Sequence, residues 1–147
     1  MNVVNQMVLE FPSHSTNEAF ARTAVACFAA QMDPTVEELN DIKTAVSEAV
    51  TNCIVHAYAD RIGPIVLKVR ILEGGILDLT VKDRGCGIVD VVKAREPMFT
   101  TGGAERSGMG FTIMESFMTS MRVNSQVGKG TTVHMKRRIV RRGSKIE

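Results

Sequence analysis

The chain has 147 residues, a length typical of one domain, and 44% of them are hydrophobic and 23% charged. This composition excludes a wholly disordered or collagen-like chain. No apolar run approaches the roughly 18 residues that a membrane-spanning helix needs, and the N-terminus lacks the basic start and apolar stretch of a signal peptide. We therefore expect one domain over residues 1–147, without membrane contact, in the cytoplasm.

Net charge and cysteine spacing give no sign of a nucleic-acid or zinc site. The formal net charge is +2, and six basic residues gather between Lys136 and Lys145. A nucleic-acid patch is one interpretation of this tail, but it has no aromatic residue and no DNA-binding motif. We expect residues 136–147 to be a flexible, solvated tail with no direct nucleic-acid contact. The three cysteines form no CxxC pair, which favours reduced thiols.

The first half of the chain predicts a strand followed by two helices. Residues 7–11 have strand character and stop at Pro12, and Ser15 and Glu18 have the spacing of a capping box. The apolar face expected for this first helix is formed by Phe20, Ala24, Cys27 and Phe28. A second helix starts with either Asp33 or Thr35 as its cap and extends to about Tyr58. Its apolar stripe is formed by Leu39, Ile42, Val46, Val50 and Cys53.

The second half predicts two hairpins separated by helices. Alternating β-branched residues over 65–72 and 76–82 flank a Glu-Gly-Gly turn. A short helix at 90–95, a glycine-rich loop at 99–108 and a helix that opens at Gly110 follow. The inward residues expected for this last helix are Phe111, Met114, Phe117 and Met118. A final hairpin pairs 121–125 with 131–135. The order favours an α+β sandwich, with helices on one face of a mixed, mostly antiparallel sheet.

Four segments together indicate a nucleotide site, although neither a P-loop nor a dinucleotide-binding motif is present. Glu48 and Asn52 lie one helical turn apart on the second helix. The other three segments are Asp83-Arg84-Gly85-Cys86-Gly87, the loop at 100–110 that leads into a helix N-terminus, and Gly128-Lys129-Gly130-Thr131-Thr132. Each segment alone is more often a solvated side chain or a turn. All four in this order are hard to obtain by chance.

These segments resemble the four nucleotide-binding boxes of the GHKL superfamily of ATPases and kinases. Within it, residues 47–52 and 105–115 are most similar to the anti-sigma serine kinases, and above all to the anti-sigma F (SpoIIAB) family of spore-forming bacteria. The resemblance extends from about Glu10 to Met135. It implies a GHKL, or Bergerat-type, ATP-binding sandwich.

The resemblance also implies ATP and Mg²⁺ as cofactors and assigns roles to residues. Asn52 would bind Mg²⁺, which takes its other ligands from phosphates and water. Asp83 would accept a hydrogen bond from the adenine amino group, assisted by Thr131, and Gly85 and Gly87 would let the backbone approach the nucleotide. Around the phosphates the resemblance places Thr100, Thr101, Arg106, Ser107, Gly108, Met109 and Gly110, with Arg106 facing developing negative charge.

Glu48 separates an enzyme from a nucleotide-binding module, because a carboxylate one turn from the Mg²⁺ ligand can accept the proton of an attacking hydroxyl. One hypothesis is a protein serine kinase that phosphorylates the anti-anti-sigma factor SpoIIAA. The other is an anti-sigma factor that holds sigma F away from RNA polymerase core during sporulation. The resemblance implies both activities in a homodimer, with Arg22 on the first helix as a candidate partner contact. A gyrase-like or MutL-like ATPase would need further domains.

Overall fold

Five strands form one antiparallel sheet in the computed structural model, which describes residues 2–96 and 110–139. The strands are β1 (Val3–Pro12), β2 (Pro64–Leu72), β3 (Ile76–Asp83), β4 (Ser120–Gln126) and β5 (Gly130–Arg138). Their spatial order is β1-β2-β3-β5-β4, and every neighbouring pair is antiparallel. The predicted α+β sandwich is confirmed, whereas the described strands contain no parallel pair that would make the sheet mixed.

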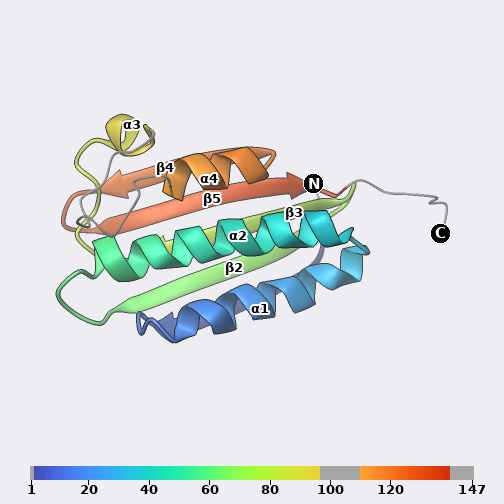
Figure 1. The fold of residues 1–147 in the computed structure, drawn as a ribbon, viewed down its shortest axis with the longest axis horizontal. Coiled ribbons are helices and arrows are strands. Elements are labelled where there is room, and N and C mark those ends of the chain that lie inside the picture. The colour runs from blue at the N-terminus through green and yellow to red at the C-terminus, as the bar shows by residue number, and fades with distance from the viewer. Residues whose placement is uncertain (1, 97–109, 140–147) are drawn as a thin grey trace.

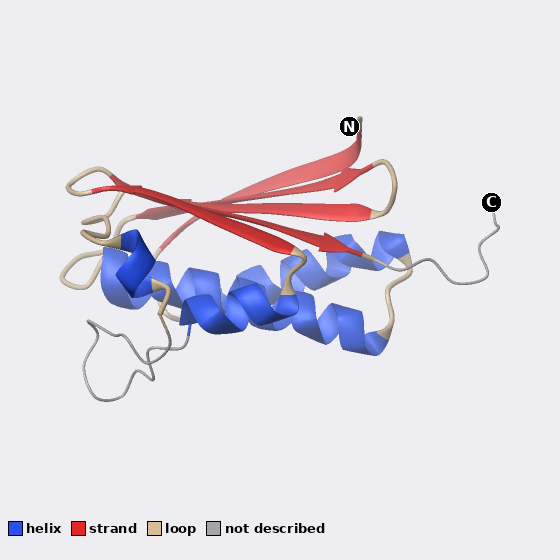
Figure 2. Cartoon of the chain, turned by 90° about the horizontal axis from the view of Figure 1, so that it is seen from above, coloured by secondary structure: helices blue, strands red, loops and turns tan. Residues whose placement is uncertain are grey.

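The longer helices form a single layer on one face of this sheet (Figures 1 and 2). They are α1 (Asn17–Ala29), α2 (Val36–Asn52) and α4 (Gly110–Phe117), and a four-residue helix α3 (Val91–Ala94) lies at one end. Side chains along a strand point alternately to the two faces of the sheet, so every second residue faces the helices. On β2, Ile65, Leu67 and Val69 are fully buried there. None of the described helices combines the length and apolarity needed to cross a membrane.

The sequence left Asp33 and Thr35 as alternative caps for the helix α2, and the structure decides between them. The Thr35 hydroxyl accepts a hydrogen bond from the backbone N–H of Glu38 at 3.0 Å, and the Glu38 carboxylate accepts one from the backbone N–H of Thr35 at 2.9 Å. Asp33 instead has a left-handed backbone, with φ of 54°. Thr35 is therefore the cap. The predicted apolar stripe is confirmed, since Ile42, Val46, Val50 and Cys53 are buried and Leu39 packs partly against them.

The predicted start of α1 is wrong. Thr16 precedes the helix, already has helical dihedral angles and makes no side-chain cap bond, so Ser15 does not form a capping box. The Glu18 carboxylate accepts a hydrogen bond from the Ser47 hydroxyl of α2 and another from the Arg22 guanidinium at 2.9 Å. The Glu18 carboxylate is thus bound by one residue of α2 and one of its own helix, and it does not take part in a cap.

The predicted apolar face of α1 is also shifted by one residue. The buried residues are Ala21, Val25 and Ala29. Phe20 remains 53% exposed and Cys27 is exposed, while Phe28 packs partly against the core. Small side chains at i, i+4 and i+8 let α1 approach α2 and the sheet closely. The larger residues suggested the wrong face because they carry more apolar area than alanine does.

Candidate functional site

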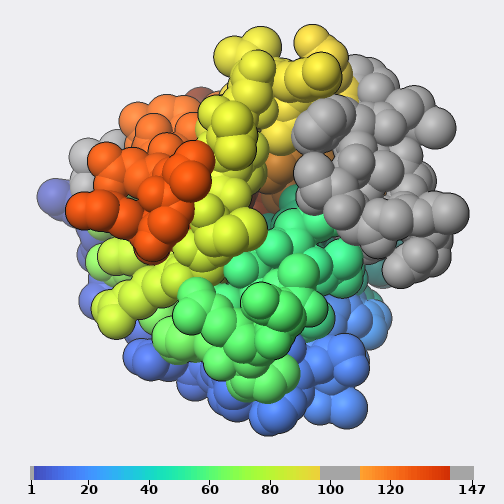
Figure 3. Space-filling view, turned by 90° about the vertical axis from the view of Figure 1, so that its left-hand side faces the viewer, coloured from blue at the N-terminus to red at the C-terminus, as the bar shows by residue number. Residues whose placement is uncertain are grey.

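A cavity of about 520 Å³ opens at the end of the molecule where α2 ends. Figure 3 faces this end, where the green C-terminal part of α2 and the yellow segment after β3 lie side by side. The described residues that line the cavity are Ala49, Asn52, Cys53, His56, Ala57, Asp83, Cys86, Gly87, Ile88, Val89, Asp90, Lys93, Ala94, Gly110, Phe111, Thr131 and Val133. The walls therefore come from α2, the turn after β3, α3, the start of α4, and β5.

Asp83 lies at the base of the cavity and is only 5% exposed. It is the last residue of β3 and continues the buried row of Leu77, Leu79 and Val81, so strand alternation turns its carboxylate inward. Oδ1 accepts backbone hydrogen bonds from Gly85 at 2.9 Å and Thr131 at 3.2 Å. These bonds fix the direction of a buried carboxylate that borders the cavity.

Thr131 stands directly opposite Asp83 in the β3–β5 ladder. Its hydroxyl also shares a 2.8 Å hydrogen bond with the hydroxyl of Ser125 on β4. The structure therefore brings together the two residues that were expected to recognise adenine. It does so through the pairing of β3 with β5, two strands that are distant in sequence.

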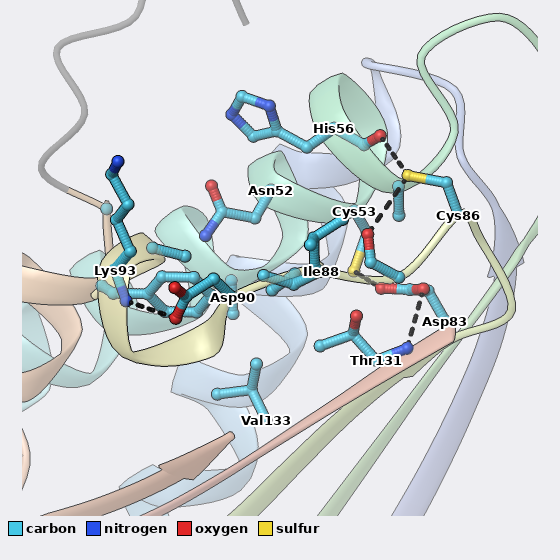
Figure 4. A pocket seen from close by; sticks show the side chains of 17 residues that line it. Asn52, Cys53, His56, Asp83, Cys86, Ile88, Asp90, Lys93, Thr131 and Val133 are labelled. Carbon is cyan, nitrogen blue, oxygen red and sulfur yellow. Dashed lines mark hydrogen bonds between the residues drawn. The ribbon is translucent and has the colours of Figure 1, made fainter. Parts of the chain in front are cut away.

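The Cys53 thiol lies beside the Asp83 carboxylate and donates a long hydrogen bond of 3.5 Å to Oδ2 (Figure 4). Burial raises the pKa of the Cys53 thiol well above its ordinary value, and the charge of Asp83 raises it further. The thiol is thus a neutral donor to the carboxylate rather than a nucleophile. The sequence predicted Cys53 only as part of the apolar stripe.

The glycines of the two predicted turns meet backbone where any side chain would collide. A Cβ on Gly85 would lie 2.3 Å from the carbonyl oxygen of Ala57, and one on Gly87 would lie 2.3 Å from that of Gln126. Gly87 also has φ of +78°, which favours glycine. Close approach between neighbouring chain segments is thus required at both glycines, and Gly87 also lines the cavity.

A π-helical turn, Cys53–Ala57, extends α2 toward the turn after β3. The carbonyl oxygen of Ala57 accepts a hydrogen bond from the backbone N–H of Cys86 at 3.1 Å. The Tyr58 hydroxyl bridges the same region by donating to the carbonyl of Pro64 at 2.6 Å and accepting from the N–H of Arg84 at 2.6 Å. Burial raises the pKa of Tyr58, so this hydroxyl stays protonated.

Glu48 and Asn52 converge on the first residue of α4. A Cβ on Gly110 would lie 3.2 Å from Oδ1 of Asn52 and 3.3 Å from Oε1 of Glu48. Asn52 borders the cavity, whereas Glu48 lies outside its described lining. The two side chains one turn apart therefore flank the same helix start.

Several expected site residues lie outside the described part of the chain. They are Thr100, Thr101, Arg106, Ser107, Gly108 and Met109. Arg22 on α1 is not among the described lining residues and forms an ion pair with Glu18 at 2.9 Å. Sequence reasoning had not assigned His56, Cys86 or Lys93 to the site, yet all three line the cavity. A helix predicted directly after the Asp83–Gly87 turn was the signal that could have pointed to Lys93.

The residues present fit a purine nucleotide. The volume lies within the roughly 300–1,000 Å³ usual for small-molecule sites, and one buried carboxylate provides a directional acceptor. Among the described residues no three His, Cys, Asp or Glu side chains form a metal cluster. The amide oxygen of Asn52 is a suitable single protein ligand for an ion that is held mainly by phosphate and water.

Comparison with known proteins identifies close relatives. Residues 11–137 match the family described as "Histidine kinase-like ATPase domain". A protein named "Anti-sigma F factor" from Geobacillus thermodenitrificans is 54% identical over 138 residues, covering 93% of this chain and 94% of that protein. A protein of the same name from Caldanaerobacter subterraneus is 56% identical over 142 residues, covering 96% and 99%.

Solved structures show the same fold at low sequence identity. The RsbU and RsbW domains of Rv1364c from Mycobacterium tuberculosis align with a TM-score of 0.69 at 20% identity, covering 92% of this chain and 32% of that one. The histidine kinase domain of a blue-light activated kinase from Erythrobacter litoralis aligns with a TM-score of 0.58 at 24% identity, covering 83% and 60%.

Proposed function

The chain belongs to the anti-sigma F factor family, within the histidine kinase-like ATPase domains, and from this premise we propose an ATP- and Mg²⁺-dependent protein serine kinase that also acts as an anti-sigma factor. Its substrate is a serine of the anti-anti-sigma factor SpoIIAA. Its second partner is sigma F, which it keeps from RNA polymerase core during sporulation. Partners of this kind imply a cytoplasmic protein.

The observation that carries the proposal is the placement of two chemically different groups around one cavity. Asp83 and Thr131 form a polar floor of the cavity that is suited to the adenine amino group. Asn52 borders the cavity, and Glu48 lies one turn before it on α2. A base-recognition end and a phosphate end are thus available to the same nucleotide.

Each residue has a role that its position supports. Asn52 holds Mg²⁺ through its amide oxygen. Glu48 accepts the proton of the incoming serine hydroxyl. Gly110 leaves room for both side chains, since a Cβ there would lie within 3.3 Å of each. Bound ATP supplies the phosphoryl group, with Mg²⁺ neutralising its charge.

The partner contacts follow from the family. The protein acts as a homodimer, and Arg22 on α1 contacts a protein partner. Its side chain is 37% exposed despite the ion pair with Glu18, so a partner carboxylate could compete for it.

The testing experiment is phosphotransfer from γ-labelled ATP to purified anti-anti-sigma factor, with and without Mg²⁺. We expect label on a serine of the added protein and none without Mg²⁺. Glu48→Gln should reduce transfer by about 10²–10⁴-fold while nucleotide and sigma binding persist. Glu10→Gln, an exposed carboxylate of β1, is the matched control and should leave transfer unchanged.

Two outcomes would contradict the kinase assignment. Label on a histidine of this chain would indicate an autokinase instead. Nucleotide binding without transfer, together with retained sigma binding, would indicate an ATP-gated anti-sigma module without kinase activity. Absence of nucleotide binding would refute the site itself.

A further inference from the structure

Lys93 stands at the rim of the cavity on α3. Among the described residues that line the cavity, it is the only lysine or arginine, and the described acids there are Asp83 and Asp90. A polyanionic ligand such as a nucleoside triphosphate needs positive charge near its phosphates. The described lining offers one such side chain.

The position of Lys93 along the cavity matches the phosphate end. Figure 4 shows its side chain rising from α3 on the opposite side of the cavity from Asp83, toward the level of the Asn52 amide. Asn52 in turn lies beside Gly110 at the start of α4. A ligand whose base reaches Asp83 would therefore extend its phosphates toward Lys93.

The short helix that carries Lys93 is held in place from three sides. The Asp90 carboxylate caps it by accepting a hydrogen bond from the backbone N–H of Lys93 at 3.1 Å. Arg95, directly after α3, forms an ion pair with Glu115 of α4 at 2.8 Å. The N–H of Ile88, before α3, donates to the Ser125 hydroxyl of β4 at 2.8 Å. These contacts fix α3, and with it the backbone of Lys93, at the rim of the cavity.

We propose that Lys93 is a further ligand-binding residue of this site and that its ammonium group contacts the phosphate chain of the bound nucleotide. This inference rests on the proposed function, because it requires a nucleotide in the cavity. It assigns to α3 a phosphate contact separate from the Asn52 position. Lys93 then contributes to affinity through charge, and base selection remains with Asp83.

The test compares ATP and adenosine binding by calorimetry for the full chain and for Lys93→Met. Loss of one charged hydrogen bond should weaken ATP binding by about tenfold, whereas adenosine binding should not change. Lys93→Arg should retain most of the ATP affinity. Lys68→Met is the matched control, since Lys68 is exposed on β2 and lies outside the described lining, and it should bind both ligands as the original chain does.

Three results with the variants would overturn the inference alone. Unchanged ATP affinity in Lys93→Met would show that the ammonium group makes no contact. Equal weakening of ATP and adenosine would indicate a packing role for α3. Equal weakening of ATP in Lys68→Met would indicate a general charge effect. If the unsubstituted chain bound neither ligand, the proposed function would fail first and this inference with it.

Discussion

Replacing Asp83 by asparagine tests whether this carboxylate selects the base. The substitution keeps size and shape, and the new amide oxygen can occupy the Oδ1 position. It can then still accept the backbone hydrogen bonds from Gly85 at 2.9 Å and Thr131 at 3.2 Å. The new amide nitrogen replaces Oδ2, so an acceptor becomes a donor at that point. A base amino group would lose its partner there.

The size of the effect follows from the bonds involved. A hydrogen bond to a charged acceptor contributes about 1.5–3 kcal/mol, so ATP binding should weaken by about 10- to 150-fold in Asp83→Asn. The fold itself should lose only about 1 kcal/mol, because both backbone bonds persist in weaker, neutral form. Loss of the contact with the Cys53 thiol, already 3.5 Å long, adds little.

The assay is competition binding of ATP against inosine triphosphate, which carries a carbonyl oxygen in place of the adenine amino group. The original chain should prefer ATP. Asp83→Asn should lose most of that preference, because its amide nitrogen can donate to the carbonyl of inosine. The ratio of the two dissociation constants therefore reports on the hydrogen bond and cancels any general loss of folded protein.

A matched control is available on the opposite face of the sheet. Asp78 is also buried, 1% exposed, and accepts hydrogen bonds from Arg70 at 2.8 and 2.6 Å. Asp78→Asn should lower stability without changing nucleotide preference. If Asp83→Asn kept the original ratio of ATP to inosine triphosphate affinity, the assignment of base selection to Asp83 would be wrong.

Three further outcomes are expected. Thr35→Ala removes the cap of α2 and should lower the free energy of unfolding by about 1 kcal/mol in urea titration. Gly85→Ala would place a methyl group 2.3 Å from the Ala57 carbonyl oxygen, and we expect lower thermal stability and lower ATP affinity by calorimetry. Because the pKa of Cys53 is raised in the folded protein, the thiol loses its proton at lower pH in the unfolded chain. Alkylation of Cys53 at pH 8 should therefore be slow while the protein is folded. The contribution of Cys53 to stability, measured against Cys53→Ala, should fall as pH rises above the ordinary thiol pKa of 9.0.

Local patterns predicted the elements well and the start of α1 poorly. The helix start near Asp33 or Thr35 and the hairpin around Gly74 depend on neighbouring residues; the structure places the cap at Thr35 and confirms the hairpin. The pattern at Ser15 and Glu18 was equally good in sequence, but Glu18 binds Ser47 of another helix. Local reasoning cannot detect such competition, because the partner is 29 residues away.

The site was predictable as a set of segments but not as a set of contacts. Strand order places β5 between β3 and β4, which sets Thr131 against Asp83. No local pattern specifies that order, and only the family resemblance suggested that the two are neighbours. The hydrogen bond from Cys53 to Asp83 and the place of Lys93 in the cavity lining needed the structure, because a buried stripe residue and an exposed helix residue look ordinary in sequence.

The end of α2 links the two halves of the cavity through consecutive residues. Asn52 lies beside the start of α4, and the next residue, Cys53, donates to Asp83 at the base. The π-helical turn that follows carries the Ala57 carbonyl to the N–H of Cys86 at 3.1 Å. One continuous backbone segment thus fixes the spacing between the proposed base contact and the proposed Mg²⁺ ligand. A shift of this segment would displace both groups together, so substitutions in the π-helical turn should change nucleotide affinity even where they touch no ligand.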